Sequence, residues 1–265
     1  MSEQAVLFEL VEDHIGLLTL NRPEHLNALN REMVEGLLAV LQRLEADRDI
    51  RALVVTGSGK AFCAGGDLHW LVQAQDTGAQ RIILEKAEEL IIRLERISLP
   101  VIAGVNGVAA GAGTALAMAC DLAIASKMAT FAPNFVSIGA VPDSGVSWYL
   151  PRRIGRQKAA ELLLTGKRLS AEEAAELGLY ASVEPMDDFR QALMAKAREI
   201  ARGPQRAVRS IKKLLKLCDW NTLEAQMEAE ASLQMAAWSE ADFAEGVQAF
   251  REGRSPRFGS SPYPD

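Results

Sequence analysis

Two short segments rich in glycine and alanine have the residue types that can expose backbone N–H groups to a ligand. The first, 61–67, reads AFCAGGD, and the second, 105–113, reads VNGVAAGAG. Each follows an apolar, strand-like run and precedes a segment of helical character. Small side chains leave the first N–H groups of a helix uncovered, and these groups carry partial positive charge. Two such turns that converge on one oxygen form an oxyanion hole. For either segment alone, the alternative is that its glycines only mark a tight turn or close helix packing.

The two turns are part of a longer pattern that covers nearly the whole chain. Its other segments are LNRPEHLNAL at 20–29, SLPVIA at 98–103, ACDL at 119–122, LTGKRLS at 164–170 and FREGRSP at 250–256. In these segments the chain resembles the enoyl-CoA hydratase/isomerase superfamily, also called the crotonase superfamily. The resemblance implies that the peptide N–H groups of Ala64 and Ala112 bind the thioester carbonyl oxygen of an acyl-CoA.

A side chain must also move a proton, because an oxyanion hole only stabilises the enolate. Hydratases of the superfamily use two glutamates, and the resemblance places Ala115 and Phe135 at those two positions. Neither side chain can activate water or donate a proton. Moving a double bond along the acyl chain needs only one base, which removes a proton from C2 and returns it at C4.

Asp143, in the segment VPDSG at 141–145, is the carboxylate that could supply this base. The segment resembles the branch that contains 3,2-enoyl-CoA isomerases and the ring-1,2-epoxyphenylacetyl-CoA isomerase, in which an Asp or Glu at this place is the base. A base would need a pKa raised by apolar neighbours. The alternative is that Asp143 caps a helix that starts near Ser144.

The leading hypothesis is therefore an isomerase that converts a 3-enoyl-CoA to a 2-enoyl-CoA. A second hypothesis is a hydratase or another crotonase-type lyase that acts on an unusual acyl-CoA through an unrecognised carboxylate. A third is a catalytically silent acyl-CoA-binding protein that kept the two turns and lost the glutamates. Coenzyme A enters as part of the substrate, and we expect no tightly bound cofactor.

The resemblance also implies which residues contact the substrate. Contacts to the coenzyme are expected from Arg22, His25, Leu26, Ala28, Ala64, Gly66, Asp67, Leu68, Phe250 and Arg254. The acyl pocket is expected to include Trp70, Leu71, Phe135 and Trp148. Each has an ordinary alternative: the arginines can be solvated at helix ends, the apolar residues can belong to the core, and Asp67 can cap a helix. Asp121 matches a structural position of the superfamily.

The composition excludes several classes of protein. The 265 residues, 49% of them hydrophobic, are enough for one large domain with a small appendage. A formal net charge of −6 argues against a nucleic-acid-binding surface. The three cysteines are far apart and suggest neither disulfides nor a metal site. With no secretory signal and no apolar run of about 18 residues, we expect a soluble, cytoplasmic protein without membrane partners.

Apolar periodicity predicts the elements that must position these residues. It indicates strands at 5–12, 15–20, 52–56 and 101–105, and amphipathic helices from Met33 onwards and around 82–94. Asn30 is a candidate helix cap, and Ser170 with Glu173 forms a capping box. We therefore expect a mixed α/β fold, which the resemblance refines to a spiral of β-β-α turns. The expected core covers 1–185, and a helical region at 186–265 forms a homotrimer or a dimer of trimers in the superfamily.

Overall fold

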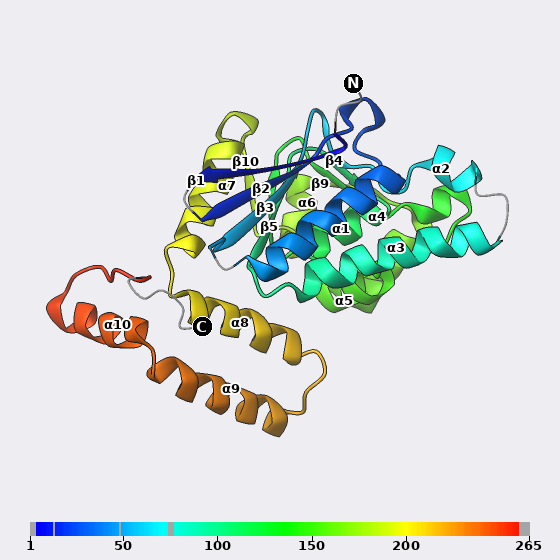
Figure 1. The fold of residues 1–265 in the computed structure, drawn as a ribbon. Helices are drawn as coiled ribbons and strands as arrows, with labels where there is room; N and C mark the ends of the chain where they lie inside the picture. Colours follow the sequence, from blue (N-terminus) through cyan, green and yellow to red (C-terminus); the bar gives the residue numbers. More distant parts are fainter. Residues whose placement is uncertain (1–3, 13, 48, 74–76, 260–265) are drawn as a thin grey trace.

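The computed structural model describes residues 4–12, 14–47, 49–73 and 77–259. They form two β-sheets with helices packed around them (Figure 1). The large sheet has the strand order β1–β2–β3–β5–β7–β10, and the small sheet has the order β4–β6–β8–β9. The large sheet consists of β1 (Val6–Glu12), β2 (Ile15–Leu20), β3 (Ala52–Gly57), β5 (Val101–Val105), β7 (Leu122–Ser126) and β10 (Ser182–Glu184). The small sheet consists of β4 (Ala61–Cys63), β6 (Val108–Ala110), β8 (Thr130–Ala132) and β9 (Leu169–Ser170).

The remaining elements are ten α-helices and two short 3₁₀ helices among the described residues. In the first half these are η1 (Pro23–His25), α1 (Arg31–Ala46), α2 (Leu68–Gln73), α3 (Thr77–Arg96), α4 (Ala112–Met118) and η2 (Phe135–Ile138). They continue with α5 (Val146–Thr165), α6 (Ala171–Glu176), α7 (Met186–Ala201), α8 (Gln205–Leu217), α9 (Leu223–Trp238) and α10 (Ala241–Glu252).

The chain repeats one path three times: a strand of the large sheet, a short strand of the small sheet, then a helix. The three repeats are β3–β4–α2, β5–β6–α4 and β7–β8–η2. Within each sheet the successive strands of these repeats are parallel. Equivalent ends of parallel neighbours lie on the same side of a sheet, so the segments that follow β4 and β6 come together. The expected mixed α/β fold is confirmed, including its β-β-α order.

Most element boundaries follow the sequence signals. β1 and β2 form the expected antiparallel hairpin, with Val6 opposite Leu20; Asp13, in its turn, lies outside the described residues. Asn30 Oδ1 accepts the Met33 N–H at 2.9 Å and so caps α1. Ser170 and Glu173 form the expected capping box at the start of α6.

Alternation along the strands of the large sheet divides its side chains between two apolar clusters. In β3, Leu53 and Val55 join the main core, which also contains residues of the small sheet and of α1, α3, α4 and α5. Ala52 and Val54 point to the other face, where they pack with residues of α7 such as Leu193. Close packing of α7 requires Gly104 in β5, because a Cβ there would overlap the Leu193 side chain.

The C-terminal helices differ in how they relate to this body. α7 begins at Met186 and covers the large sheet, so it belongs to the body by its contacts. α8 is attached to the body by Arg209 and Lys212, whereas α9 and α10 lie farther from it (Figure 1), and α9 has no buried residue. The part that projects thus begins at α9 rather than at residue 186, and a division into two domains stays a prediction. No described helix is long and apolar enough to span a membrane.

Candidate active site

The two glycine- and alanine-rich turns meet, as the sequence predicts. Gly65 has φ +95°, and a Cβ built on it would lie 2.9 Å from the Ala110 oxygen and 3.3 Å from the Ala112 nitrogen. A Cβ on Gly113 would overlap the carbonyl oxygen of Cys63. Only glycine permits this approach of one backbone to the other, so Gly65 and Gly113 are needed for the two turns to pack against each other.

The backbone hydrogen bonds show which N–H groups of the turns are available. The Ala64 N–H donates to the Leu26 carbonyl oxygen at 3.0 Å, so it is not available for a thioester, contrary to our expectation. The N–H of Gly66 has no acceptor among the residues that the structure describes. Leu29 hydrogen-bonds instead to the two neighbours of Gly66, namely Gly65 and Asp67. Ala112 is the first residue of α4, and no side chain caps that helix. Its N–H therefore has no side-chain acceptor, which is typical of the first N–H groups of a helix.

An ion pair holds the first turn in place. Arg22 contacts Asp67 Oδ2 at 3.1 Å and donates to the Ala28 carbonyl oxygen at 2.7 Å. Asp67 Oδ1 accepts the His69 N–H at 3.0 Å, which confirms the capping alternative for this residue. Burial opposes the ionisation of Asp67, but hydrogen bonds from Arg22 and from the backbone outweigh it and lower its pKa. The guanidinium of Arg22 is thus already occupied.

The other residues expected at the coenzyme lie in two separate places. His25 and Leu26 are exposed at and just after η1, and Leu68 is exposed at the start of α2. Phe250, 87% exposed, lies on α10, and Arg254 beyond it forms ion pairs with Glu245 and Glu252. Figure 1 shows α10 at the opposite end of the molecule from α2. A single chain therefore does not bring the two groups together.

Apolar side chains occupy the positions at which the resemblance implies the hydratase glutamates. Ala115 is fully buried in α4, and Phe135 is buried in the main core. A Cβ on Gly111 would lie 3.9 Å from the Phe135 ring, so Phe135 lies beside the second turn. Trp70 packs partly buried against the same core, and Leu71 lies close to Gly66. Cys63 also belongs to this core, and burial raises its pKa to about 12, which makes it a poor nucleophile.

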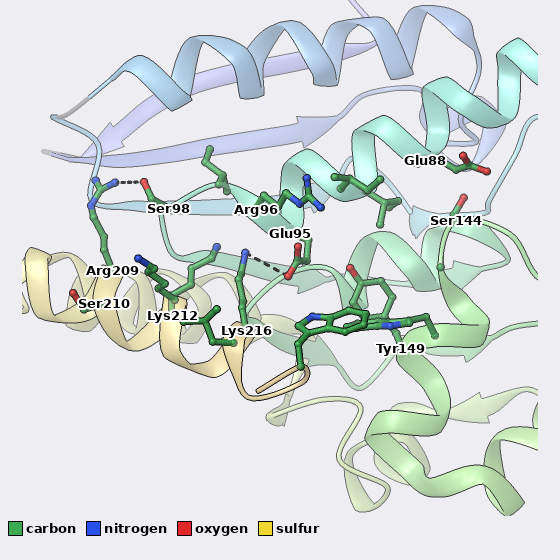
Figure 2. Close-up of a pocket in the computed structure, with 18 of the residues that line it drawn as sticks. Glu88, Glu95, Arg96, Ser98, Ser144, Tyr149, Arg209, Ser210, Lys212 and Lys216 are labelled. Atoms are coloured by element: carbon green, nitrogen blue, oxygen red, sulfur yellow. Dashed lines mark hydrogen bonds and ion pairs between the residues drawn. The ribbon is translucent and has the colours of Figure 1, made fainter. Parts of the chain in front are cut away.

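A cavity of about 920 Å³ lies between α3, α8 and the start of α5 (Figure 2). Two of the expected site residues, Asp143 and Trp148, line it; Trp70, Leu71 and Phe135 do not. Its apolar wall consists of Ile91, Ile92, Ile97, Leu217, Trp148 and Trp220. Trp220, beyond the end of α8, stacks on Trp148 with ring centroids 5.9 Å apart and 23° between the planes. The Arg152 guanidinium lies 4.2 Å from the Trp148 ring.

Asp143 lies in the loop between η2 and α5, where Ser144 and Gly145 both have positive φ. The residue that caps α5 is Gly145, and no side chain takes part, so the structure does not support the capping alternative for Asp143. Its Oδ1 is buried and has no hydrogen-bond partner within the described chain. Burial raises the pKa of Asp143, the Ser144 side chain partly offsets this, and the charge of Glu88 raises it further. A poorly solvated carboxylate with a raised pKa is suited to accept a proton.

Basic residues of α8 form the other end of the cavity. Lys212 is buried and donates to Asp121 at 2.6 Å and to the Leu99 carbonyl oxygen at 2.7 Å. Asp121 also accepts the Val101 N–H at 2.7 Å, which agrees with its expected structural role. Lys216 faces Glu95 at 3.6 Å, and burial lowers the pKa of Lys216. These contacts attach α8 to the body.

Glu88 lines the same cavity as Asp143 and is absent from the residues expected from the sequence. It projects from α3 into the same cavity as Asp143, and Figure 2 shows it at the end where Ser144 lies. The signal was its spacing, because Glu88, Ile91, Ile92, Glu95 and Arg96 share one face of a helix. The sequence did not show what lies opposite that face.

Among the described residues, no group of three potential ligands could hold a metal ion.

Comparison with known proteins extends these findings. The family model described as enoyl-CoA hydratase/isomerase matches residues 11–261. A protein of Rhodobacter capsulatus named as a probable enoyl-CoA hydratase is 42% identical over 97% of this chain and 99% of its own length. The 1,2-epoxyphenylacetyl-CoA isomerase of Escherichia coli K12 is 40% identical over 94% of this chain and 96% of its own length. The crystal structure of an enoyl-CoA hydratase from Bacillus anthracis superposes with a TM-score of 0.93 at 31% identity, over 97% of this chain and all of the other.

Proposed function

Because the chain belongs to the enoyl-CoA hydratase/isomerase family, we propose that it is an isomerase that converts a 3-enoyl-CoA to a 2-enoyl-CoA. The observation that carries the proposal is the distribution of carboxylates. Apolar, buried residues occupy positions 115 and 135. Asp143 lines a cavity, and the pKa of its carboxyl group is raised. The similarity to a relative named as an isomerase supports the same reading.

In the proposed reaction, Asp143 carries one proton between two carbons. Its carboxylate removes a proton from C2, and the negative charge moves to the thioester oxygen. The protonated Asp143 then returns the proton to C4, and the double bond settles between C2 and C3. The N–H of Ala112 stabilises the oxygen in between. We assign the second donor to Gly66 rather than to Ala64, because the Ala64 N–H already binds Leu26.

The coenzyme and the oligomer complete the proposal. His25, Leu26, Ala28, Leu68 and the turn around Asp67 would contact coenzyme A, while Arg22 would act through Asp67. Phe250 and Arg254 can reach this coenzyme only from another subunit, since α10 lies far from α2 in one chain (Figure 1). A homotrimer or a dimer of trimers, which the family resemblance implies, would supply that contact.

A hydratase is the second candidate, and one observation favours it specifically. Glu88 shares the cavity with Asp143, so the site offers two carboxylates after all. One could activate water while the other donates a proton. Relatives named as hydratases are consistent with this alternative. Its product would be a 3-hydroxyacyl-CoA.

The test is a 3-enoyl-CoA assay that follows conjugated 2-enoyl thioester absorbance and product mass together. We expect conjugation without a gain of water. Asp143→Asn should lower kcat by about 10²- to 10⁴-fold and leave acyl-CoA affinity nearly unchanged. Asp187→Asn, an exposed carboxylate on α7, is the matched control. Water addition would instead select the hydratase, and acyl-CoA binding without α-proton exchange would select a silent binding protein.

A further inference from the structure

Asp143 shares one end of its cavity with a second carboxylate. Glu88 comes from the middle of α3, and Figure 2 shows it at the same end of the cavity as Ser144, whereas Arg209 and Ser210 lie at the opposite end. Glu88 is exposed and makes no hydrogen bond or ion pair with any residue that the structure describes. Arg81 pairs with Glu85, whose hydrogen bond raises the pKa of Arg81 most, and the charge of Glu88 raises it further, so Glu88 keeps its negative charge without a direct ion pair.

The other charged and titratable groups of the cavity do not neutralise this end. From α3, Glu95 pairs with Lys216 of α8, and Arg96 has no partner among the described residues. From α5, Tyr149 stays neutral, because burial raises its pKa. From α8, Lys212 binds Asp121, Arg209 binds Ser98 and the Ile50 carbonyl oxygen, and Lys213 has no partner within the described chain. Burial is the main cause of the raised pKa of Asp143, and among these charged groups Glu88 is the one whose charge raises it further.

We propose that Glu88 is a positioning residue that holds the transferred proton on Asp143 between its removal from C2 and its return to C4. The inference rests on the proposed isomerase function. It concerns the lifetime of one protonated state and assigns Glu88 no contact with the substrate.

The physical reason is repulsion between like charges. When Asp143 is ionised, two carboxylates face one cavity; when Asp143 takes the C2 proton, the repulsion disappears. Glu88 thus makes Asp143 a stronger base and a slower donor to water. An acyl chain in the cavity would displace water and weaken the screening, so the effect should be larger in the substrate complex.

The first experiment measures the titration of Asp143 without any turnover. The intact protein is labelled with ¹³C at the aspartate Cγ, and the Asp143 signal is identified as the one lost in Asp143→Asn. We expect Glu88→Gln to move the midpoint of this signal to lower pH. Glu89→Gln, a neighbouring exposed carboxylate of α3 that pairs with Arg93, should leave it in place.

The second experiment uses the reaction itself. The acid limb of kcat should shift to lower pH in Glu88→Gln, and by more than the acid limb of kcat/KM, because kcat reports the substrate complex. In D₂O the same variant should place more solvent deuterium at C4, since Asp143 releases its proton to water more readily.

The outcomes separate the two proposals. A shifted Asp143 midpoint without isomerase activity would keep the coupling of Glu88 to Asp143 and remove both the isomerase and the proton-holding role. Isomerase activity with an unchanged midpoint, acid limb and deuterium content in Glu88→Gln would overturn the role of Glu88 alone. A lower kcat with an unchanged acid limb would mean that Glu88 only stabilises the structure.

Discussion

The burial of Asp143 makes it a better base for proton transfer but lowers the stability of the folded protein when the carboxylate is charged. Its Oδ1 is buried without a partner, and its pKa lies above the ordinary carboxyl value because burial disfavours the charge. The folded state therefore binds the Asp143 proton more tightly than the unfolded state does. This costs no stability below the unfolded pKa, and the full cost appears once the pH exceeds the folded pKa.

Asp143→Asn should consequently be more stable than the wild type near neutral pH. The neutral amide avoids the burial of a charge, and the advantage should shrink as the pH falls through the folded pKa towards the ordinary carboxyl range. Thermal unfolding at several pH values measures this difference. An equal Tm at neutral pH would show that the carboxylate is well solvated in the folded protein.

Two glycine substitutions should have opposite effects on stability. Gly113→Ala should destabilise the fold by more than about 3 kcal/mol, because the new methyl group would overlap the Cys63 backbone. Gly246→Ala should stabilise it by about 0.5–1 kcal/mol, because this glycine lies within α10 and the nearest atom is 3.6 Å from the new Cβ. Denaturant unfolding measures both, and equal effects would contradict the close contact of the two turns.

For single residues, the sequence patterns indicated which residues have suitable chemistry more reliably than which atoms those residues contact. The two turns and Asp143 stood out because few residue types can expose backbone or carry a proton. Ala64 was misassigned because nothing in the sequence reveals that Leu26 passes close enough to accept its N–H. Glu88 went unnoticed because Asp143, which lines the same cavity, lies far along the chain.

Helix starts were predicted correctly where the sequence signal involves only residues that are close together in the chain. Side-chain caps at Asn30 and Ser170 require only neighbours within three residues, and both formed as predicted. The strands β4 and β6 lie inside the segments expected to be turns. Each has only three residues, which is too short for an alternation of apolar and polar residues to be recognised in the sequence. Both strands are identified only by their parallel pairing within the small sheet.

One of the contacts that attach α8 to the body is the ion pair between the buried Lys212 and Asp121. Lys212→Met should cost about 1–3 kcal/mol in free energy of unfolding, because it leaves the Leu99 carbonyl oxygen and Asp121 without the buried Lys212 donor. The double variant with Asp121→Asn should lose less than the sum of the single variants, since the asparagine carries no charge and can still accept the Val101 N–H. Additive losses in chemical denaturation would show that the pair does not act as a unit.

At the scale of the whole molecule, the projecting helices expose large apolar side chains. Trp238, Met227 and Met235 on α9 and Phe250 on α10 are each more than half exposed. Exposed apolar patches of this kind usually mark contact with another protein chain. Together with the separation of α10 from α2, they are consistent with the proposed oligomer.

We expect the protein to sediment as a species at least three times the mass of its 28.8 kDa chain. Met235→Asp should shift it towards smaller species and weaken coenzyme A binding, because Phe250 and Arg254 would lose their neighbouring subunit. Met128→Asp, a methionine of similar exposure between β7 and β8, is the matched control. A monomeric wild type with full activity would contradict the shared site.

The meeting of the two turns has a consequence for genetics. The donors that we propose at Gly66 and Ala112 are peptide groups, which every substitution at those positions except proline preserves. A screen for loss of function would therefore find no residue whose removal deletes the oxyanion hole. It would find Gly65 and Gly113 instead, where a mutation adds atoms rather than taking a chemical group away. Null alleles there would act by disturbing the close backbone packing of the two turns, as the destabilisation expected of Gly113→Ala implies, and not by removing a functional group.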